Sequence, residues 1–242
     1  MNEREFEVGV IRPIDCMKEA FELIKADYWI LFAISLVGIL IGGATMYVLL
    51  GAMICGIMFC YLERIDGRQV SFDGLWKGFQ WWLPGLIAVL IIAVPMVVVY
   101  MILYAPFIVA MVMGSKLNEG ELVGLLAGAF VIDLVVVVLM VCFHTLLIFV
   151  FPLIVDRNYG VWKAITTSMR AVWANLGGVA GLYGVGFVLS LAGMLAFCVG
   201  TYFVLPIIMA GNILAYRKVF PARGRNMEPP SPPNFSGAGS YR

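Results

Sequence analysis

Residues 171–216 read AVWANLGGVAGLYGVGFVLSLAGMLAFCVGTYFVLPIIMAGNILAY, a stretch of 46 residues without a charged side chain. One continuous helix of that length would extend about 69 Å at 1.5 Å per residue. The hydrocarbon core of a bilayer is only about 30 Å thick. The stretch therefore predicts two transmembrane helices, and we expect the chain to reverse in the region of residues 191–193.

A second uncharged stretch, residues 28–62, is also longer than one upright span requires. The adjacent glycines Gly42 and Gly43 weaken a helix at its middle. They predict a reversal there, with one helix near residues 28–42 and another near residues 44–62.

The two middle stretches, residues 81–115 and 122–155, predict one long helix each. The second is interrupted only by Asp133 and ends at Phe151-Pro152. The first carries three prolines spaced eleven residues apart, Pro84, Pro95 and Pro106. This spacing places them on one helix face. Membrane helices tolerate proline where neighbouring helices satisfy the freed carbonyls. The total is six spans. Fewer spans, down to four, are the alternative if residues 28–62 form one tilted span or a re-entrant pair.

The composition agrees with a membrane protein. Apolar residues make up 62% of the 242-residue chain, charged residues only 13%, and the mean hydropathy is +0.98. Soluble domains average about 45–50% and about 25% respectively. These values exclude a disordered chain, a disulfide scaffold and a typical cytosolic enzyme. We therefore expect an all-α polytopic transmembrane helix bundle with six spans and interfacial amphipathic helices.

No cofactor or cleavable leader is expected. The cysteines form no CxxC pair and are interpreted as small packing residues: Cys16, Cys55, Cys60, Cys142 and Cys198. The first 27 residues contain seven carboxylates and no apolar core, so they do not look like a signal peptide. The first transmembrane helix is expected to direct insertion.

The basic residues predict the orientation of the chain. Cytoplasmic loops of membrane proteins carry an excess of Lys and Arg. A six-span arrangement puts all but Lys116 on one side, which predicts a multi-pass protein of the bacterial inner (plasma) membrane with both termini cytoplasmic. The residues on that side are Arg4, Arg12, Lys18, Lys25, Arg64, Arg68, Lys77, Arg157, Lys163, Arg170, Arg217, Lys218, Arg223, Arg225 and Arg242.

Three cytoplasmic segments share a pattern of amphipathic residues followed by aromatic residues: 14–29, 72–82 and 162–173. Such segments are typical of helices that lie in the membrane interface. They suggest three repeats of an interfacial helix plus a transmembrane hairpin, although any loop that enters a membrane tends to show basic and then aromatic residues. We expect the basic residues to meet the lipid bilayer and its anionic headgroups, and their spread along one face argues against nucleic-acid binding.

Polar side chains within the apolar stretches are the candidate sites, because an ionisable group inside a bilayer is by default a functional hypothesis. Asp133 and His144 lie eleven residues apart on one predicted helix, about 16 Å along its axis. They could form a proton or cation path, or His144 could bond a neighbouring helix while Asp133 is hydrated. Asn175 and Asn212 are expected to form hydrogen bonds between helices.

One segment carries a recognisable motif, made of a proline, an acidic residue, a glycine, Ala-x-x-x-Ser and a later asparagine: Pro152, Asp156, Gly160, Ala164, Ser168 and Asn175. It resembles a motif of uncharacterised bacterial polytopic membrane proteins, which are similar to the membrane domain attached to some glycerophosphodiester phosphodiesterases. The resemblance implies a polytopic membrane fold. It does not imply the phosphodiesterase activity, because no soluble stretch here is long enough for the catalytic domain.

We predict a cytoplasmic segment at residues 1–12, a membrane domain at 13–220 and a disordered Pro/Gly-rich cytoplasmic tail at 221–242. The sequence contains no recognised catalytic motif, so we expect a protein that is not an enzyme. Because few polar groups fall in the spans, the preferred function is a non-catalytic membrane scaffold or assembly factor with unknown protein partners. The alternative is a small-solute or proton-coupled transporter.

Overall fold

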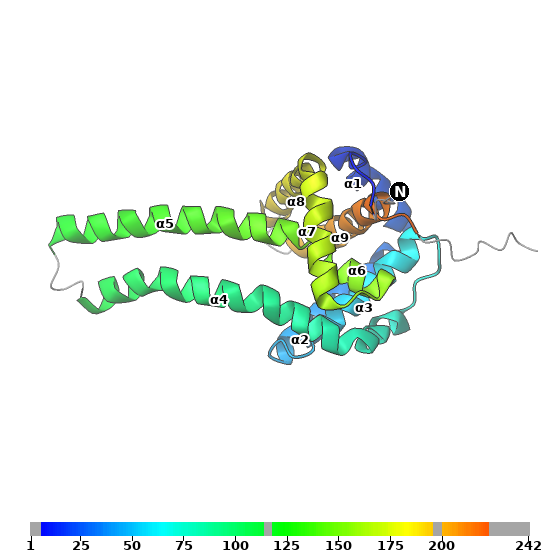
Figure 1. The fold of residues 1–242 in the computed structure, drawn as a ribbon, viewed down its shortest axis with the longest axis horizontal. Helices are drawn as coiled ribbons and strands as arrows, with labels where there is room; N and C mark the ends of the chain where they lie inside the picture. Colours follow the sequence, from blue (N-terminus) through cyan, green and yellow to red (C-terminus); the bar gives the residue numbers. More distant parts are fainter. Residues whose placement is uncertain (1–5, 114–117, 196–199, 223–242) are drawn as a thin grey trace, which may run out of the picture.

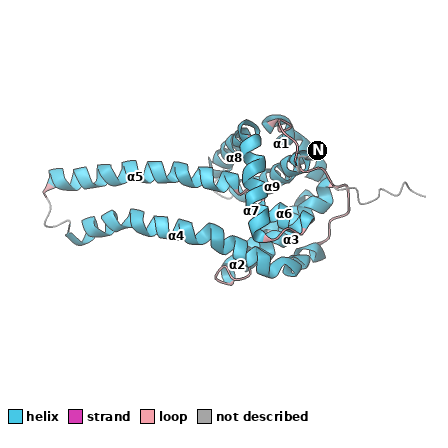
Figure 2. Cartoon of the chain, in the orientation of Figure 1, coloured by secondary structure: helices cyan, strands magenta, loops and turns pink. Residues whose placement is uncertain are grey.

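The computed structural model describes residues 6–113, 118–195 and 200–222, and in these ranges the chain is helical and forms no strand (Figure 2). The all-α fold is thus confirmed. The predicted tail beyond residue 222 lies outside the described residues, as do Lys116 and Cys198. The helices are α1 Pro13–Ile24, α2 Tyr28–Ala44, α3 Leu50–Ile65, α4 Trp82–Met113, α5 Glu119–Leu146, α6 Val150–Arg157, α7 Val161–Ala174, α8 Leu176–Leu195 and α9 Gly200–Val219, with 3-10 helices η1 Lys25–Asp27 and η2 Phe72–Trp81.

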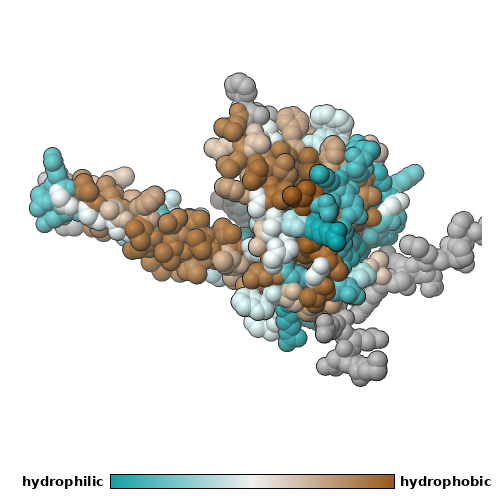
Figure 3. Space-filling model, turned by 90° about the horizontal axis from the view of Figure 1, so that it is seen from above, coloured by the Kyte–Doolittle hydropathy of each residue, from teal (hydrophilic) through white to brown (hydrophobic). Residues whose placement is uncertain are grey.

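The helices form a bundle from which α4 and α5 extend together as a long hairpin (Figure 1). The other two hairpins, α2–α3 and α8–α9, lie within the bundle, where α3 packs against α2, η2, α4, α6 and α9. Apolar residues cover most of the extended hairpin in Figure 3, while polar residues gather at its tip and at the opposite end of the molecule.

Four helical stretches are long and apolar enough to cross a membrane: Pro13–Ala44, Phe72–Val112, Glu119–Arg157 and Leu176–Leu195. They indicate a membrane-embedded protein. The helix α3 has only 16 residues, and α9 contains Asn212, Arg217 and Lys218, which lowers its hydropathy. Length and composition therefore identify four candidate spans, and the other two predicted spans remain a proposal.

The first reversal occurs later than the sequence predicts. The helix α2 continues through Gly42 and Gly43, and the turn follows at residues 45–49, with positive φ at Met46 (48°) and Tyr47 (68°). The Thr45 hydroxyl accepts a bond from the Leu49 amide over 3.3 Å. A Cβ on Gly42 would lie 2.6 Å from Leu50 Cδ1, so this glycine permits close packing of α2 on α3 instead of breaking α2.

The prediction of one long helix for each middle stretch is confirmed for the first stretch and wrong for the second. Pro95 and Pro106 lie inside the single helix α4, and the second stretch divides into α5 and the short α6. In the last stretch the reversal predicted at residues 191–193 is wrong, because these residues lie within α8, which is described as far as Leu195, and α9 begins at Gly200. Residues 196–199 lie outside the described ranges.

Small residues with GxxxG spacing favour close helix packing, and three such pairs in the sequence predict packing within the chain: Gly38/Gly42, Gly124/Gly128 and Gly177/Gly181. This prediction holds only in part. A Cβ on Gly38 would lie 2.8 Å from Ile57 Cδ1, and one on Gly181 would lie 2.5 Å from Pro13 Cγ. Space is open around Gly124, Gly128 and Gly177. The prediction is wrong at these three positions, because a Cβ there would meet no described atom within 4 Å.

The first amphipathic segment docks on the bundle. The helix α1 packs against α9, α8 and α3. It buries Cys16, Met17 and Ala20, while Asp15 and Lys18 remain exposed. The structure places an amphipathic helical segment directly before each hairpin, namely α1, η2 and α7. The threefold repeat itself stays a prediction.

Candidate functional site

The two ionisable candidates of the apolar stretches, Asp133 and His144, lie on α5 but do not share a cavity. Asp133 is half-buried partway along the extended hairpin, and it forms no hydrogen bond or ion pair with any described residue. His144 lies in the last turn of α5, where its Nδ1 is 3.2 Å from the carbonyl oxygen of Met140. The arrangement does not join these two residues into one path.

His144 lines a crevice of about 780 Å³ between α5 and α8, which we call the α5–α8 crevice. Its walls also include Tyr100 of α4 and Trp173 of α7, together with Tyr183 and Phe187 of α8. Most of the lining is apolar. Asp133 is not among the lining residues.

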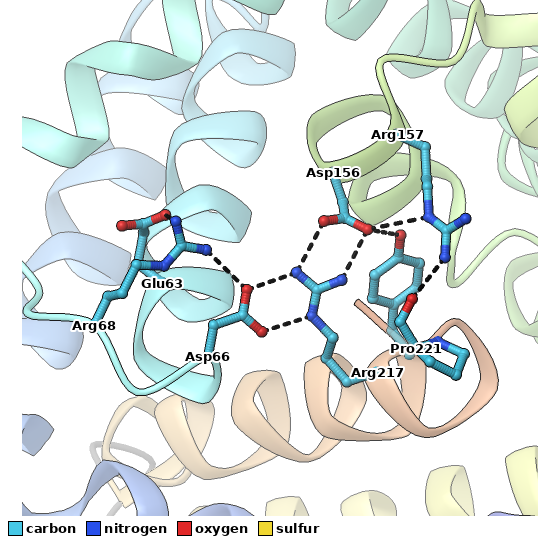
Figure 4. Close-up of polar contacts among 8 residues, drawn as sticks. Glu63, Asp66, Arg68, Asp156, Arg157, Arg217 and Pro221 are labelled. Carbon is cyan, nitrogen blue, oxygen red and sulfur yellow. Dashed lines mark hydrogen bonds and ion pairs between the residues drawn. The ribbon is translucent and has the colours of Figure 1, made fainter. Parts of the chain in front are cut away.

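Charged side chains from three segments meet in a largely buried group (Figure 4), at the end of the bundle away from the hairpin tip (Figure 1). Arg217 Nε and Nη2 donate to the two carboxylate oxygens of Asp66 over 2.7 and 2.8 Å. Its Nη1 and Nη2 donate to the two oxygens of Asp156, each over 2.8 Å. The Arg217 side chain is only 10% exposed. One arginine thus makes paired, charge-assisted bonds to two carboxylates, which is a geometry that lysine cannot reproduce.

The cluster extends beyond this arginine. The Tyr216 hydroxyl donates to Asp156 over 2.7 Å, and Arg157 Nη2 donates to the Pro221 carbonyl over 2.9 Å. On the other side, Arg68 bonds Asp66 over 2.9 Å and Glu63 over 2.8 Å. Three arginines face three carboxylates, so the formal charges balance. We call these residues the Arg217 cluster: Glu63, Asp66, Arg68, Asp156, Arg157, Tyr216 and Arg217.

The cluster connects three segments that are far apart in the chain. Asp66 is the C-cap residue of α3, Asp156 lies in the last turn of α6, and Arg217 lies in the last turn of α9. Cations are favourable at helix C-termini, where carbonyl groups are unsatisfied. The geometry therefore joins the ends of three helices, and each side chain of the cluster has a partner within it.

Asn175 is a second linking residue. It follows α7 as its C-cap and is 5% exposed. Its Oδ1 accepts from the Gly9 amide over 2.7 Å, and its Nδ2 donates to the Glu7 and Ala171 carbonyls over 3.0 and 2.9 Å. The N-terminal segment is consequently packed on the bundle from residue 6 onward, and the Glu7 amide also donates to the Val219 carbonyl over 2.8 Å.

The other motif residues lie at the junctions around α6 and α7. The Ser168 hydroxyl donates to the Leu146 carbonyl over 2.7 Å and accepts from the Phe149 amide over 3.3 Å, which satisfies backbone groups where α5 gives way to α6. Gly160 is the N-cap of α7. Pro152 and Ala164 are buried. Each motif residue therefore has a structural position in this region.

Asn212 does not form the predicted hydrogen bond between helices within the described residues. It is half-buried on α9, and no hydrogen bond joins it to another described residue. Within the described ranges no three His, Cys, Asp or Glu side chains come close enough to hold a metal ion.

The sequence pointed to Asp156 through the motif, but it did not reveal the importance of Asp66 and Arg217. Arg217 follows an apolar stretch, and in the sequence it looks like any basic residue at a cytoplasmic boundary. Only its burial between two carboxylates distinguishes it from the neighbouring Lys218, which pairs with the half-exposed Glu19. Comparison of the chain with family models, curated proteins and solved structures finds no match.

Proposed function

We propose that this chain is a six-span inner-membrane protein that acts as a non-catalytic scaffold or assembly factor, with both termini cytoplasmic. Three helical hairpins, α2–α3, α4–α5 and α8–α9, would each cross the bilayer twice. This orientation would put the basic residues of the Arg217 cluster and of α7 on the cytoplasmic side, which the positive-inside rule favours. The motif resemblance to polytopic bacterial membrane proteins points the same way.

The scaffold function is supported by the use that the fold makes of its buried polar groups. Four of these side chains form hydrogen bonds between different helices or segments: Arg217, Asp156, Asn175 and Ser168. Such fully satisfied networks rigidify a structure. A transporter needs several polar groups converging near the middle of the membrane. On the extended hairpin, Asp133 does not line the α5–α8 crevice and forms no hydrogen bond or ion pair with any described residue.

Topology is tested by single-cysteine labelling of the full chain. Met46, at the α2–α3 turn, is 85% exposed, and Gln69 is exposed in the connection between α3 and η2. With six spans, a membrane-impermeant maleimide labels Met46→Cys in intact spheroplasts and Gln69→Cys only in inverted vesicles. Labelling of Gln69→Cys from outside would instead contradict the six-span arrangement.

The transport alternative is favoured by one observation, the imidazole of His144 in the crevice wall, and it is tested separately. Purified protein is reconstituted in vesicles containing a pH-sensitive dye, and proton flux is driven by a potassium diffusion potential. We expect no flux above that of protein-free vesicles. A flux that falls in the Asp133→Asn/His144→Gln variant would refute the scaffold proposal.

The positive test of a scaffold uses photo-crosslinking amino acids in living cells. They are placed at exposed positions on different faces of the α4–α5 hairpin, such as Met101 and Phe130, which are 72% and 69% exposed. A scaffold predicts that one face repeatedly yields the same membrane protein, identified by mass spectrometry and reproduced in the reverse direction from that partner. Lipid adducts alone on every face would contradict the proposal.

A further inference from the structure

The α5–α8 crevice has the length of one membrane leaflet. Along α8 its lining extends from Leu176 to Phe187, and along α5 from Leu146 back to Val137. At 1.5 Å per residue these segments measure about 16 and about 14 Å. One leaflet contributes half of a hydrocarbon core about 30 Å thick. The crevice therefore matches the depth of a single layer of acyl chains.

Its walls leave room for a molecule. A Cβ on Gly184, which lines the crevice, would meet open space. Trp173 and Phe187 are 72% and 64% exposed, so the crevice opens sideways to the surroundings. Its volume of about 780 Å³ falls within the range of about 300–1,000 Å³ that is usual for small-molecule sites.

Polar and aromatic groups follow the crevice from the α7–α8 junction along α8. Trp173 and Leu176 lie at the junction of α7 and α8, and Arg170 is exposed on α7 one turn before Trp173. Tyr183 lies seven residues into α8, about 10 Å deeper, and its hydroxyl has no partner among the described residues. His144 provides a second polar group in the wall.

We propose that this crevice binds one anionic glycerophospholipid from the leaflet adjoining α7. The phosphate lies at Arg170 and the indole of Trp173, because basic and aromatic residues hold headgroups at the interface. The ester oxygens accept from the Tyr183 hydroxyl, and one acyl chain occupies the apolar wall beyond it. This proposal rests on membrane embedding and does not depend on the scaffold function or on the sidedness of the chain.

The experiment uses the full chain in vesicles made of equal parts phosphatidylcholine and phosphatidylglycerol. A trace of phosphatidylglycerol with a photoreactive diazirine in its acyl chain is the probe, and the labelled peptides are mapped by mass spectrometry. We expect labelling to concentrate on residues 137–146 and 176–187. Unlabelled phosphatidylglycerol should compete for these peptides more effectively than phosphatidylcholine.

Two variants with matched controls test the two halves of the site. Gly184→Leu fills the crevice and should lower labelling of these peptides about tenfold, whereas Gly43→Leu, made at another glycine with open surroundings, should not. Arg170→Gln should weaken the preference for the anionic lipid about fivefold, which corresponds to one basic group at a membrane surface. Lys18→Gln removes an exposed basic residue of α1 and should leave the preference unchanged.

Two labelling patterns would overturn the proposal. Labelling spread evenly over the crevice and the exposed faces of α4 and α5 would mean that lipids only surround the protein. The same conclusion would follow if Gly184→Leu labelled like the wild type. Circular dichroism of each variant in the same vesicles shows that altered labelling does not come from unfolding.

Discussion

Replacing Arg217 with methionine removes the guanidinium from the Arg217 cluster while keeping an unbranched side chain. Four charge-assisted bonds of 2.7–2.8 Å are lost, and Asp66 and Asp156, with side chains 16% and 13% exposed, lose this partner. Breaking a buried ion pair by removing one partner costs about 3–5 kcal/mol. We expect a loss of this size and not a larger one, although two carboxylates lose a partner. Arg68 and Tyr216 still compensate part of the carboxylate charge.

The assay is reversible unfolding of the full-length protein in mixed micelles with increasing sodium dodecyl sulfate, followed by circular dichroism. The adjacent Lys218→Met is the matched control, since it breaks only the pair with the half-exposed Glu19. Such surface pairs contribute about 0–1 kcal/mol. The triple variant Arg217→Met/Asp66→Asn/Asp156→Asn should recover part of the lost stability, because the two carboxylates are then neutral. Arg157 loses its carboxylate partner Asp156 in this variant and keeps its bond to the Pro221 carbonyl.

The reasoning would be refuted if Arg217→Met unfolded with the same free energy as Lys218→Met. It would also fail if neutralising both carboxylates in the Arg217→Met background lowered the stability further. Either result would mean that water satisfies the carboxylates and that the cluster does not hold the ends of α3, α6 and α9 together.

The remaining predictions concern the junctions of the bundle. Asn175→Ala should cost about 1–3 kcal/mol, because its partners are left unsatisfied, and should expose the segment around Gly9 to limited proteolysis; unchanged cleavage would contradict the link. Ser168→Ala should lower the unfolding free energy by about 1 kcal/mol in the same micelle assay. Gly78→Ala should destabilise by about 1–3 kcal/mol, because its Cβ would lie 2.1 Å from the Ala52 carbonyl oxygen, whereas Gly43→Ala should be neutral. Equal stability of these two glycine variants would show that η2 can move away from α3.

The sequence correctly predicted that the chain reverses within its long apolar stretches, but the reversals lie later in the chain than predicted. The reversal predicted at Gly42 and Gly43 occurs at residues 45–49, because glycine within a closely packed hairpin is tolerated where a neighbour fills the space. The prolines of α4 were correctly interpreted as lying within one helix. The GxxxG pair of α5 was wrongly assigned to packing within the chain, since spacing alone does not say which neighbour lies opposite.

The candidate site was predicted less completely than the fold. The motif identified Asp156, Ser168 and Asn175 as residues of interest, but their partners are backbone groups and distant side chains that no local pattern names. The emphasis on Asp133 and His144 came from a general rule about charges in membranes, and these two residues do not share a cavity.

The sequence by itself determined the helical class of the protein and its membrane-like character. Those properties depend on local runs such as 171–216, whose length can be compared directly with the thickness of a bilayer. Only the tertiary structure decided which charges are buried together. Arg217 meets Asp66 and Asp156 across separations of 151 and 61 residues, and this meeting depends on how α3, α6 and α9 pack, which the periodicity of each helix alone does not specify.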